Sequence, residues 1–152
     1  MEPLKKAVFV DRDGTLNYDN GYTHKISDLK IYEDMVPLLK GYYDRGYIII
    51  VITNQSGINR GYYSVEEMEE FNDKLAEVFI KYGIKIEDFF YCPHTPEEAC
   101  NCRKPEAGLI HMAVKKYNID INSSIIIGDS ESTDGKLASR LGIKFIKVHG
   151  YN

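Results

Sequence analysis

The stretch Ala7-Val8-Phe9-Val10-Asp11-Arg12-Asp13-Gly14-Thr15 joins a short apolar run to a pair of carboxylates. Four consecutive apolar residues predict a strand that is buried on both faces, as in a parallel sheet. Asp11 and Asp13 follow this strand directly and are two residues apart, so their side chains can face the same way. An isolated pair of this kind is most often a solvated acidic turn, so its meaning depends on the rest of the chain.

Similar units repeat along the chain, each with a helical segment, a Gly or Asn, and a β-branched strand. Gly and Asn adopt the left-handed conformation that ends helices. In these units they are Gly46, Gly83, Asn118 and Gly142. The predicted strands cover residues 7–10, 47–52, 89–91, 124–127 and 144–148. The clearest predicted helix runs from Ser64 to Tyr82 and begins with a capping box of Ser64 and Glu67. This alternation predicts an α/β fold, a three-layer Rossmann-like sandwich with a mainly parallel central sheet.

The length and charge of the chain exclude several classes of protein. A length of 152 residues predicts a single domain over residues 1–152. The net charge of −4 argues against nucleic acid and anionic membranes as partners. The longest apolar run, residues 47–52, is far shorter than the ~20 residues that a bilayer requires. Charged residues rather than a cleavage site follow Val10, so we expect a cytoplasmic protein.

Polar side chains follow the later strands as well, where an open parallel sheet binds its ligands. The second strand leads into Thr53-Asn54-Gln55-Ser56, the third into a segment that ends in Arg103-Lys104, and the fourth into Gly128-Asp129. Carboxylates, a hydroxyl and a lysine at one edge can bind a cation and an anion together, and Asp129 suits Mg²⁺. Asp134, five residues further on, is either a partner of the metal site or the N-cap of the last helix.

Two carboxylates at one strand end can divide the work of phosphate transfer. One attacks phosphorus and forms an acyl phosphate, and the other moves a proton to and from oxygen. Thr53 and Lys104 are candidates for holding the phosphoryl oxygens. Taken alone, Thr53 is a strand-end turn residue and Lys104 a surface lysine. The order of the whole set along the chain is hard to obtain by chance.

Three cysteines and a histidine lie within eleven residues, as Cys92, His94, Cys100 and Cys102. Four such ligands complete a tetrahedral zinc site, and a full set of protein ligands indicates structural zinc. The alternative is three reduced cysteines in a core with a histidine at the surface. The prolines and glutamates between them indicate a polar loop. We therefore predict a zinc-binding loop at residues 92–102 that holds the following Arg103 and Lys104 in place.

These segments together resemble a known superfamily. The segments Asp11–Leu16, Thr53–Gly57, Arg103–Pro105 and Gly128–Asp129 resemble the four motifs of the haloacid dehalogenase (HAD) phosphatases. The segment Asn20-Gly21-Tyr22, the run from Thr53 to Gly61 and the Cys/His cluster are similar to the D-glycero-D-manno-heptose-1,7-bisphosphate phosphatases. The histidinol-phosphate phosphatases are the nearest sister group. The resemblance implies a HAD fold without a cap domain.

The resemblance also implies roles for single residues. Asp11 would be the nucleophile, Asp13 the general acid and base, and Thr53 and Lys104 the groups that stabilise the transferring phosphoryl group. Mg²⁺ would bind to Asp11, the backbone carbonyl of Asp13 and Asp129. The substrate contacts would be Asp19, Asn20, Gly21, Tyr22, Asn54, Gln55, Ser56 and Arg103. Ser130 departs from the lysine usual in the heptose family, which weakens the analogy on that side.

The predicted activity is a Mg²⁺-dependent phosphomonoesterase that acts through an aspartyl phosphate. The predicted substrate is a small sugar phosphate, D-glycero-D-manno-heptose 1,7-bisphosphate, and we expect a monomer. One alternative keeps the chemistry and changes the substrate to histidinol phosphate. The other is a signalling domain that accepts a phosphoryl group without turnover.

Overall fold

A five-stranded parallel sheet forms the centre of the computed structural model, which describes residues 3–149. Its strands are β1 (Ala7–Val10), β2 (Ile48–Asn54), β3 (Ile86–Cys92), β4 (Ile125–Gly128) and β5 (Lys144–Lys147). They lie in the order β3-β2-β1-β4-β5, and every neighbouring pair is parallel. The predicted α/β class is confirmed, and the sheet formed by these strands is parallel throughout.

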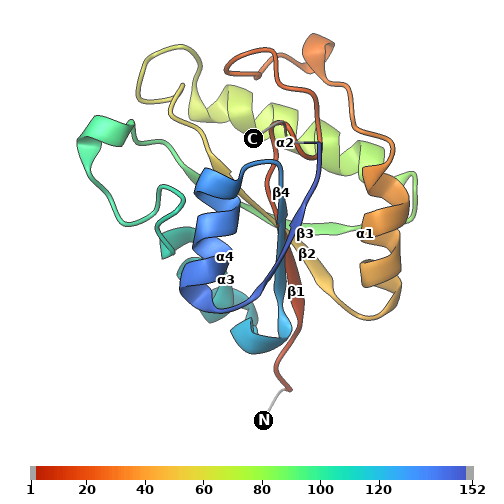
Figure 1. Ribbon diagram of the computed structural model, residues 1–152. Coiled ribbons are helices and arrows are strands. Elements are labelled where there is room, and N and C mark those ends of the chain that lie inside the picture. The colour runs from red at the N-terminus through yellow and green to blue at the C-terminus, as the bar shows by residue number, and fades with distance from the viewer. Residues whose placement is uncertain (1–2, 150–152) are drawn as a thin grey trace.

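Helices cover both faces of this sheet. They are α1 (Met35–Asp44), α2 (Val65–Ile80), α3 (Gly108–Tyr117) and α4 (Lys136–Leu141). The short helices η1 (Ile26–Asp28), η2 (Pro96–Glu98), η3 (Ile121–Ser123) and the π-helical η4 (Glu131–Gly135) lie between them. Figure 1 shows α1 and α2 on one side of the sheet and α3 and α4 on the other, which gives the expected three layers.

The alternation of side chains along β1 separates two hydrophobic cores. Val8 and Val10 pack with residues of α1 and α2, whereas Ala7 and Phe9 pack with residues of α3 and α4. All four side chains are completely buried. The strand is therefore apolar on both faces because each face has its own layer of helices.

The predicted helix ends are confirmed by the backbone. Ser64 is the N-cap of α2, and its hydroxyl accepts a hydrogen bond of 3.1 Å from the backbone N–H of Glu67. The Glu67 carboxylate accepts one of 3.0 Å from the N–H of Ser64, which completes the capping box. The four turn residues between helices and strands all have left-handed backbone angles: Gly46, Gly83, Asn118 and Gly142.

Two strands are longer at their carboxyl ends than expected. β2 continues through Thr53 and Asn54, and β3 continues to Cys92. The loops that follow β1, β2 and β3 gather at one end of the sheet, at the top of Figure 1. Between residues 3 and 149 no helix has the length and the apolar character needed to cross a bilayer.

Candidate active site

A buried lysine joins two carboxylates at the carboxyl end of β1. The ammonium group of Lys104 donates hydrogen bonds to Asp11 Oδ1 at 2.9 Å, to Asp134 Oδ1 at 2.8 Å and to the carbonyl oxygen of Ile52 at 2.9 Å. Lys104 is only 3% exposed and Asp134 is completely buried. The three donor hydrogens of the ammonium group are thus all used, and its charge lies between the two acids.

Burial and charge together shift the pKa values of this cluster. Burial raises the pKa of Asp11 to about 6 against the opposing effect of Lys104, and the nearby Asp134 adds to the rise. Burial, together with the proximity of Asp11, raises the pKa of Asp129 to about 6. Burial lowers the pKa of Lys104, but the charges of Asp11 and Asp134 outweigh it and raise that pKa above its ordinary value. The cluster therefore has more acidic groups than the single ammonium can neutralise.

The excess of carboxylates fits a hard divalent cation. Oxygen atoms of Asp11, Asp129 and Asp134 lie within 4.8 Å of one another. The second oxygen of Asp134 is buried and has no hydrogen-bond partner among residues 3–149. Gly14 has a φ of +82°, and a Cβ there would lie 2.3 Å from Asp129 Oδ2. The absence of a side chain at Gly14 therefore gives the Asp129 carboxylate the space that it occupies. Oxygen ligands close together and lacking partners are what Mg²⁺ requires.

Asp134 is not placed where one of its two predicted roles, the N-cap of the last helix, requires it. The residue lies within the π-helical η4, and the N-cap of α4 is Gly135, so Asp134 is not a helix cap. Its carboxylate instead binds Lys104 and lies in the same acidic group as Asp11 and Asp129. The first interpretation, a partner of the metal site, agrees with this position.

The carboxylate of Asp13 accepts hydrogen bonds at both oxygens. Oδ1 accepts from Arg12 Nε at 2.9 Å and from Asn17 Nδ2 at 3.0 Å. Oδ2 accepts from Arg12 Nη2 at 3.1 Å and from Gln55 Nε2 at 3.0 Å. Asp13 still lines the pocket beside Asp11. Its orientation is therefore set by side chains from two parts of the chain, the loop after β1 and the loop after β2.

The amide groups of Asn54 and Gln55 are bonded to protein groups. Gln55 Nε2 donates to Asp13 and, at 2.8 Å, to the hydroxyl of Thr53, and the Tyr63 hydroxyl donates to Gln55 Oε1. Asn54 accepts from the backbone N–H of Lys104 at 2.9 Å and donates to its carbonyl oxygen at 3.2 Å. Both residues line the pocket, yet both N–H groups of Gln55 are already engaged. The predicted contact of Gln55 with the substrate therefore cannot use these two N–H groups while their hydrogen bonds are intact.

The segment from Asp19 to Tyr22 forms a tight turn at the rim. Asp19 accepts hydrogen bonds from the backbone N–H of Gly21 and from the hydroxyl of Thr23, both at 3.0 Å. Gly21 and Tyr22 have φ angles of 92° and 53°. Tyr22 is 45% exposed and lines the pocket with Asp19 and Gly21. Asn20 accepts from the Thr23 hydroxyl and lies outside the described pocket lining.

These side chains surround one pocket of about 310 Å³. Its walls are formed by Asp11, Asp13, Asp19, Gly21, Tyr22, Thr53, Asn54, Gln55, Ser56, Tyr63, Arg103, Lys104 and Thr133. Most of the predicted site residues therefore lie around a single cavity. The sequence analysis assigned no role to Tyr63 or Thr133, nor to Arg12 and Asn17 behind Asp13. The one signal available for Arg12 was its position inside the first motif, between Asp11 and Asp13.

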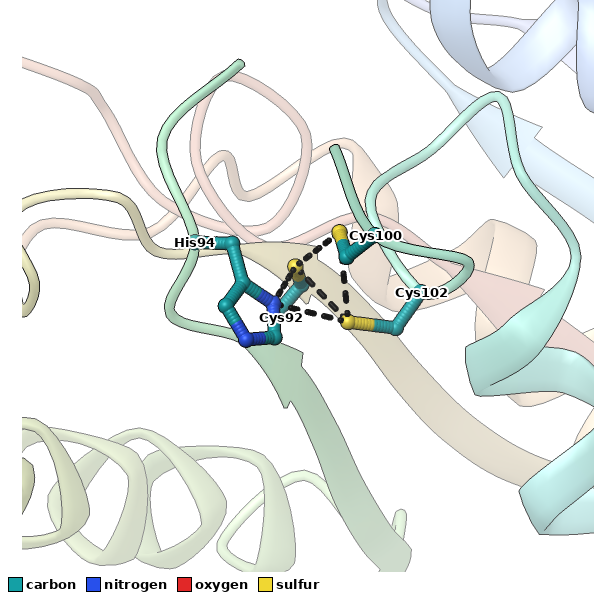
Figure 2. Close-up of side chains that lie close together, drawn as sticks. All are labelled: Cys92, His94, Cys100 and Cys102. Atoms are coloured by element: carbon teal, nitrogen blue, oxygen red, sulfur yellow. Dashed lines mark hydrogen bonds between the residues drawn. The ribbon is translucent and has the colours of Figure 1, made fainter. Parts of the chain in front are cut away.

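The predicted zinc ligands lie together at the end of β3. Figure 2 shows Cys92 at the end of the strand, His94 in the loop that follows, and Cys100 and Cys102 on the returning segment. His94 Nδ1 is 3.3 Å from the sulfur atoms of both Cys92 and Cys102. Cys100 Sγ is 3.6 Å from Cys92 Sγ and 3.7 Å from Cys102 Sγ. Cys92 is buried in the core, and Cys100 and Cys102 pack against the same cluster, which also agrees with the alternative of three reduced core cysteines.

The spacing of two of the three sulfur pairs fits a zinc ion. Four ligands at about 2.3 Å in a tetrahedron place their sulfur atoms roughly 3.7 Å apart, as in the pairs that include Cys100, whereas Cys92 and Cys102 lie closer, at 2.9 Å. Burial raises the pKa of Cys92, so without a cation this sulfur is held as a neutral thiol. The backbone N–H of Arg103 donates to Cys100 Sγ at 3.3 Å, which ties the cluster to the residue before Lys104.

Comparison with known proteins identifies the family. A family model described as polynucleotide kinase 3 phosphatase matches residues 6–149. A Thermoplasma acidophilum protein named "Probable D-glycero-D-manno-heptose-1,7-bisphosphate 7-phosphatase" is 50% identical over 92% of this chain and 88% of its own. The D-glycero-beta-D-manno-heptose-1,7-bisphosphate 7-phosphatase of Haemophilus ducreyi is 42% identical over 92% of this chain and 80% of its own.

A solved structure gives the same result for the fold. The crystal structure of D,D-heptose 1,7-bisphosphate phosphatase from B. bronchiseptica, complexed with magnesium and phosphate, superposes with a TM-score of 0.83 at 26% identity. The match covers 92% of this chain and 78% of that chain. The chain therefore belongs to the haloacid dehalogenase superfamily, in the phosphatase family that includes the D-glycero-D-manno-heptose-1,7-bisphosphate 7-phosphatases.

Proposed function

We propose that this phosphatase removes the phosphate at C7 of D-glycero-D-manno-heptose 1,7-bisphosphate with the help of Mg²⁺. The observation that carries the proposal is the contact of Lys104 with Asp11 at the base of a polar pocket. The names of relatives at 42% and 50% identity supply the substrate. Arg103 and the turn at Asp19–Tyr22 form the wall that would contact the sugar and its second phosphate.

In the first step a carboxylate oxygen of Asp11 attacks phosphorus and forms an acyl phosphate. The bond between phosphorus and the sugar oxygen breaks, and its electron pair stays on that oxygen. Asp13, in its protonated form, gives the oxygen a proton, and the dephosphorylated sugar leaves. Lys104 and the Thr53 hydroxyl stabilise the negative charge of the transferring group.

In the second step water attacks the phosphorus of the acyl phosphate. The Asp13 carboxylate takes a proton from this water, which returns Asp13 to its acidic form. The bond between phosphorus and the Asp11 oxygen breaks, and inorganic phosphate is released. Asp11 is a carboxylate again, so the protein is unchanged after one turnover.

Two metal ions fit the donor groups. Asp11, Asp129 and the backbone carbonyl of Asp13 would hold Mg²⁺, with Asp134 close by, and the ion would neutralise phosphoryl charge when bound. Cys92, His94, Cys100 and Cys102 would hold a structural zinc ion. The magnesium in a related heptose phosphatase structure supports the first assignment, and the grouping of the four Cys and His ligand atoms within 4.8 Å supports the second.

The test is phosphate release from two substrates in parallel. We expect Mg²⁺-dependent hydrolysis of heptose 1,7-bisphosphate, assayed as both anomers at C1, to be much faster than that of histidinol phosphate. Asp11→Asn should abolish the reaction. Faster hydrolysis of histidinol phosphate would overturn the substrate, and a phosphorylated protein that is stable for hours would favour a signalling domain instead.

Three further expectations belong to the same proposal. We propose that the chain works as one domain, since a single five-stranded sheet joins elements from β1 to β5. Residues 1, 2 and 150–152 of the expected domain lie outside the described residues. The monomeric state and the cytoplasmic location stay predictions, and light scattering after size-exclusion chromatography measures the first of them.

A further inference from the structure

Arg12 is a completely buried arginine between the two aspartates of the first motif. Burying a guanidinium group is costly unless its charge and its donors are satisfied. In addition to the fork onto Asp13, Nη2 donates to the carbonyl oxygen of Thr23 at 2.6 Å and Nη1 donates to Asn72 Oδ1 at 3.0 Å. The guanidinium carbon also lies 4.5 Å from the centre of the Phe71 ring. Arg12 is therefore built into the core with each of its terminal nitrogen atoms engaged.

The side chain of Arg12 does not line the pocket formed by the described residues. An influence of Arg12 on the reaction must therefore pass through a neighbour. That neighbour is Asp13, the group to which Arg12 donates two hydrogen bonds in a fork. A bidentate fork fixes both the position and the plane of a carboxylate, which single bonds from Asn17 and Gln55 do not do.

The fork itself is anchored on a helix. Asn72 and Phe71 are neighbours on α2, and Phe71 is completely buried in the core beneath the sheet. The contact with Thr23 adds a link to the loop that carries Asp19–Tyr22. Asp13 is thus connected through Arg12 both to a rigid helix and to the wall of the pocket.

We propose that Arg12 is a positioning residue that holds Asp13 in the orientation for proton transfer, with Asn72 as its anchor. This inference rests on the proposed function, in which Asp13 protonates the leaving oxygen. Neither Arg12 nor Asn72 is among the residues that line the pocket. Displacing a catalytic group by a small distance can reduce a rate by about 100-fold, so loosening the fork should be measurable.

The leaving group distinguishes positioning from general damage. When the bond between phosphorus and a sugar oxygen breaks, the oxygen needs the proton of Asp13. The p-nitrophenolate anion is a stable leaving group and needs none. Because kcat/KM reports the steps up to formation of the acyl phosphate, a misplaced Asp13 should lower kcat/KM for the sugar phosphate and spare kcat/KM for p-nitrophenyl phosphate.

The experiment compares Arg12→Lys, Asn72→Leu and the exposed control Asn122→Leu on these two substrates. Arg12→Lys keeps the charge and loses the fork. We expect its kcat/KM for the sugar phosphate to fall by about 100-fold, and that for p-nitrophenyl phosphate to change by less than about threefold. Asn72→Leu should show the same selectivity with a loss of about five- to tenfold, and Asn122→Leu should behave as the wild type.

The other outcomes contradict the inference in separate ways. An equal loss on both substrates, or no loss, would overturn the positioning role of Arg12. If Arg12→Lys does not fold, Asn72→Leu alone decides, because its side chain lies outside the pocket. A wild type that hydrolyses neither substrate would overturn the proposed function itself, whereas an active wild type with equal losses overturns only the role of Arg12.

Discussion

The ammonium nitrogen of Lys104 lies 2.9 Å from an oxygen of Asp11 and is shared with Asp134 at 2.8 Å. The nucleophile candidate and the phosphate-binding candidate are therefore in direct contact before any substrate binds. Because the lysine approaches from a loop after β3 and Asp11 follows β1, this contact joins parts of the chain that are 93 residues apart. The geometry predicts that Lys104 contributes to stability in addition to its proposed role in phosphate binding.

Replacing Lys104 should damage both properties. In Lys104→Met the carboxylates of Asp11 and Asp134 lose their shared cation, which should lower the free energy of unfolding by about 3–5 kcal/mol. The value of kcat should fall by about 10²–10³-fold because one stabilising charge is lost. Urea unfolding and steady-state kinetics measure the two effects.

The double variant Lys104→Met/Asp134→Asn separates the effect on stability from the effect on kcat. It removes one of the uncompensated carboxylates, so we expect part of the lost stability to return while kcat stays low. A single Lys104→Met variant with nearly normal kcat would contradict the assigned role of the lysine.

Gly14→Ala should weaken Mg²⁺ binding. A left-handed backbone costs a non-glycine residue about 1 kcal/mol, and at Gly14 the new Cβ also meets Asp129 Oδ2 at 2.3 Å. Gly46 is a matched control, because its φ is +92° and a Cβ there meets nothing within 4 Å. Isothermal titration should show Mg²⁺ affinity at least about tenfold weaker in Gly14→Ala. Equal affinities in Gly14→Ala and Gly46→Ala would disprove the argument.

Removal of zinc should raise KM and lower thermal stability. Without the ion, the loop from Cys92 to Cys102 loses its closure, and the bond from Arg103 N–H to Cys100 no longer holds Arg103 and Lys104 in place. The zinc content is measured by elemental analysis before and after chelation, with Mg²⁺ restored for the assay. Unchanged activity in a preparation verified to be free of zinc would refute this prediction.

The stability of the metal-free protein should depend on pH through Asp11. The pKa of Asp11 is raised from 3.8 to about 6, so between these values the folded state holds a proton that the unfolded state has lost. The free energy of unfolding contributed by Asp11 therefore falls as the pH rises from about 4 to about 6. The difference between the wild type and Asp11→Asn, measured without Mg²⁺ by urea unfolding, isolates this contribution.

Mg²⁺ should reverse the fall in the free energy of unfolding that accompanies ionisation of Asp11. The ion binds the ionised carboxylates, so its stabilising effect should be larger at pH 7 than at pH 5. A gain in melting temperature that is the same at both pH values would show that Asp11 and Asp129 are not coupled to metal binding.

The fold could be predicted where burial is uniform. β1 has its predicted bounds because both of its faces are apolar and covered by helices. β3 was predicted too short, because this edge strand contains half-buried polar residues such as Glu87 and Asp88, which hide its pattern. The other edge strand, β5, ends one residue before its predicted end, so the polar residues of β3 rather than its place in the sheet made it hard to identify.

The site was predictable only in part, for a related reason. Asp11 directly follows β1 and Lys104 lies in a recognisable segment between β3 and α3, and the structure brings them together. The pairing of Lys104 with Asp134 depends on the π-helical turn of η4. This turn has no periodic pattern of apolar residues from which it could be predicted. The burial of Arg12 depends on Asn72, which is 60 residues away, and arginine is ordinarily exposed. Contacts of this length do not follow from local pattern.

The two hydrogen bonds between the Asn54 side chain and the backbone of Lys104 have an evolutionary consequence. The chain leaves the sheet at Cys92 and is fastened again at Lys104, so both ends of the excursion are fixed. Insertions or deletions between His94 and Cys100, which leave the three cysteines and the histidine in place, can then change the length of this excursion while both of its ends stay fixed. The lysine proposed to bind the phosphoryl group can in this way keep its place beside Asp11 while one neighbouring segment changes in length.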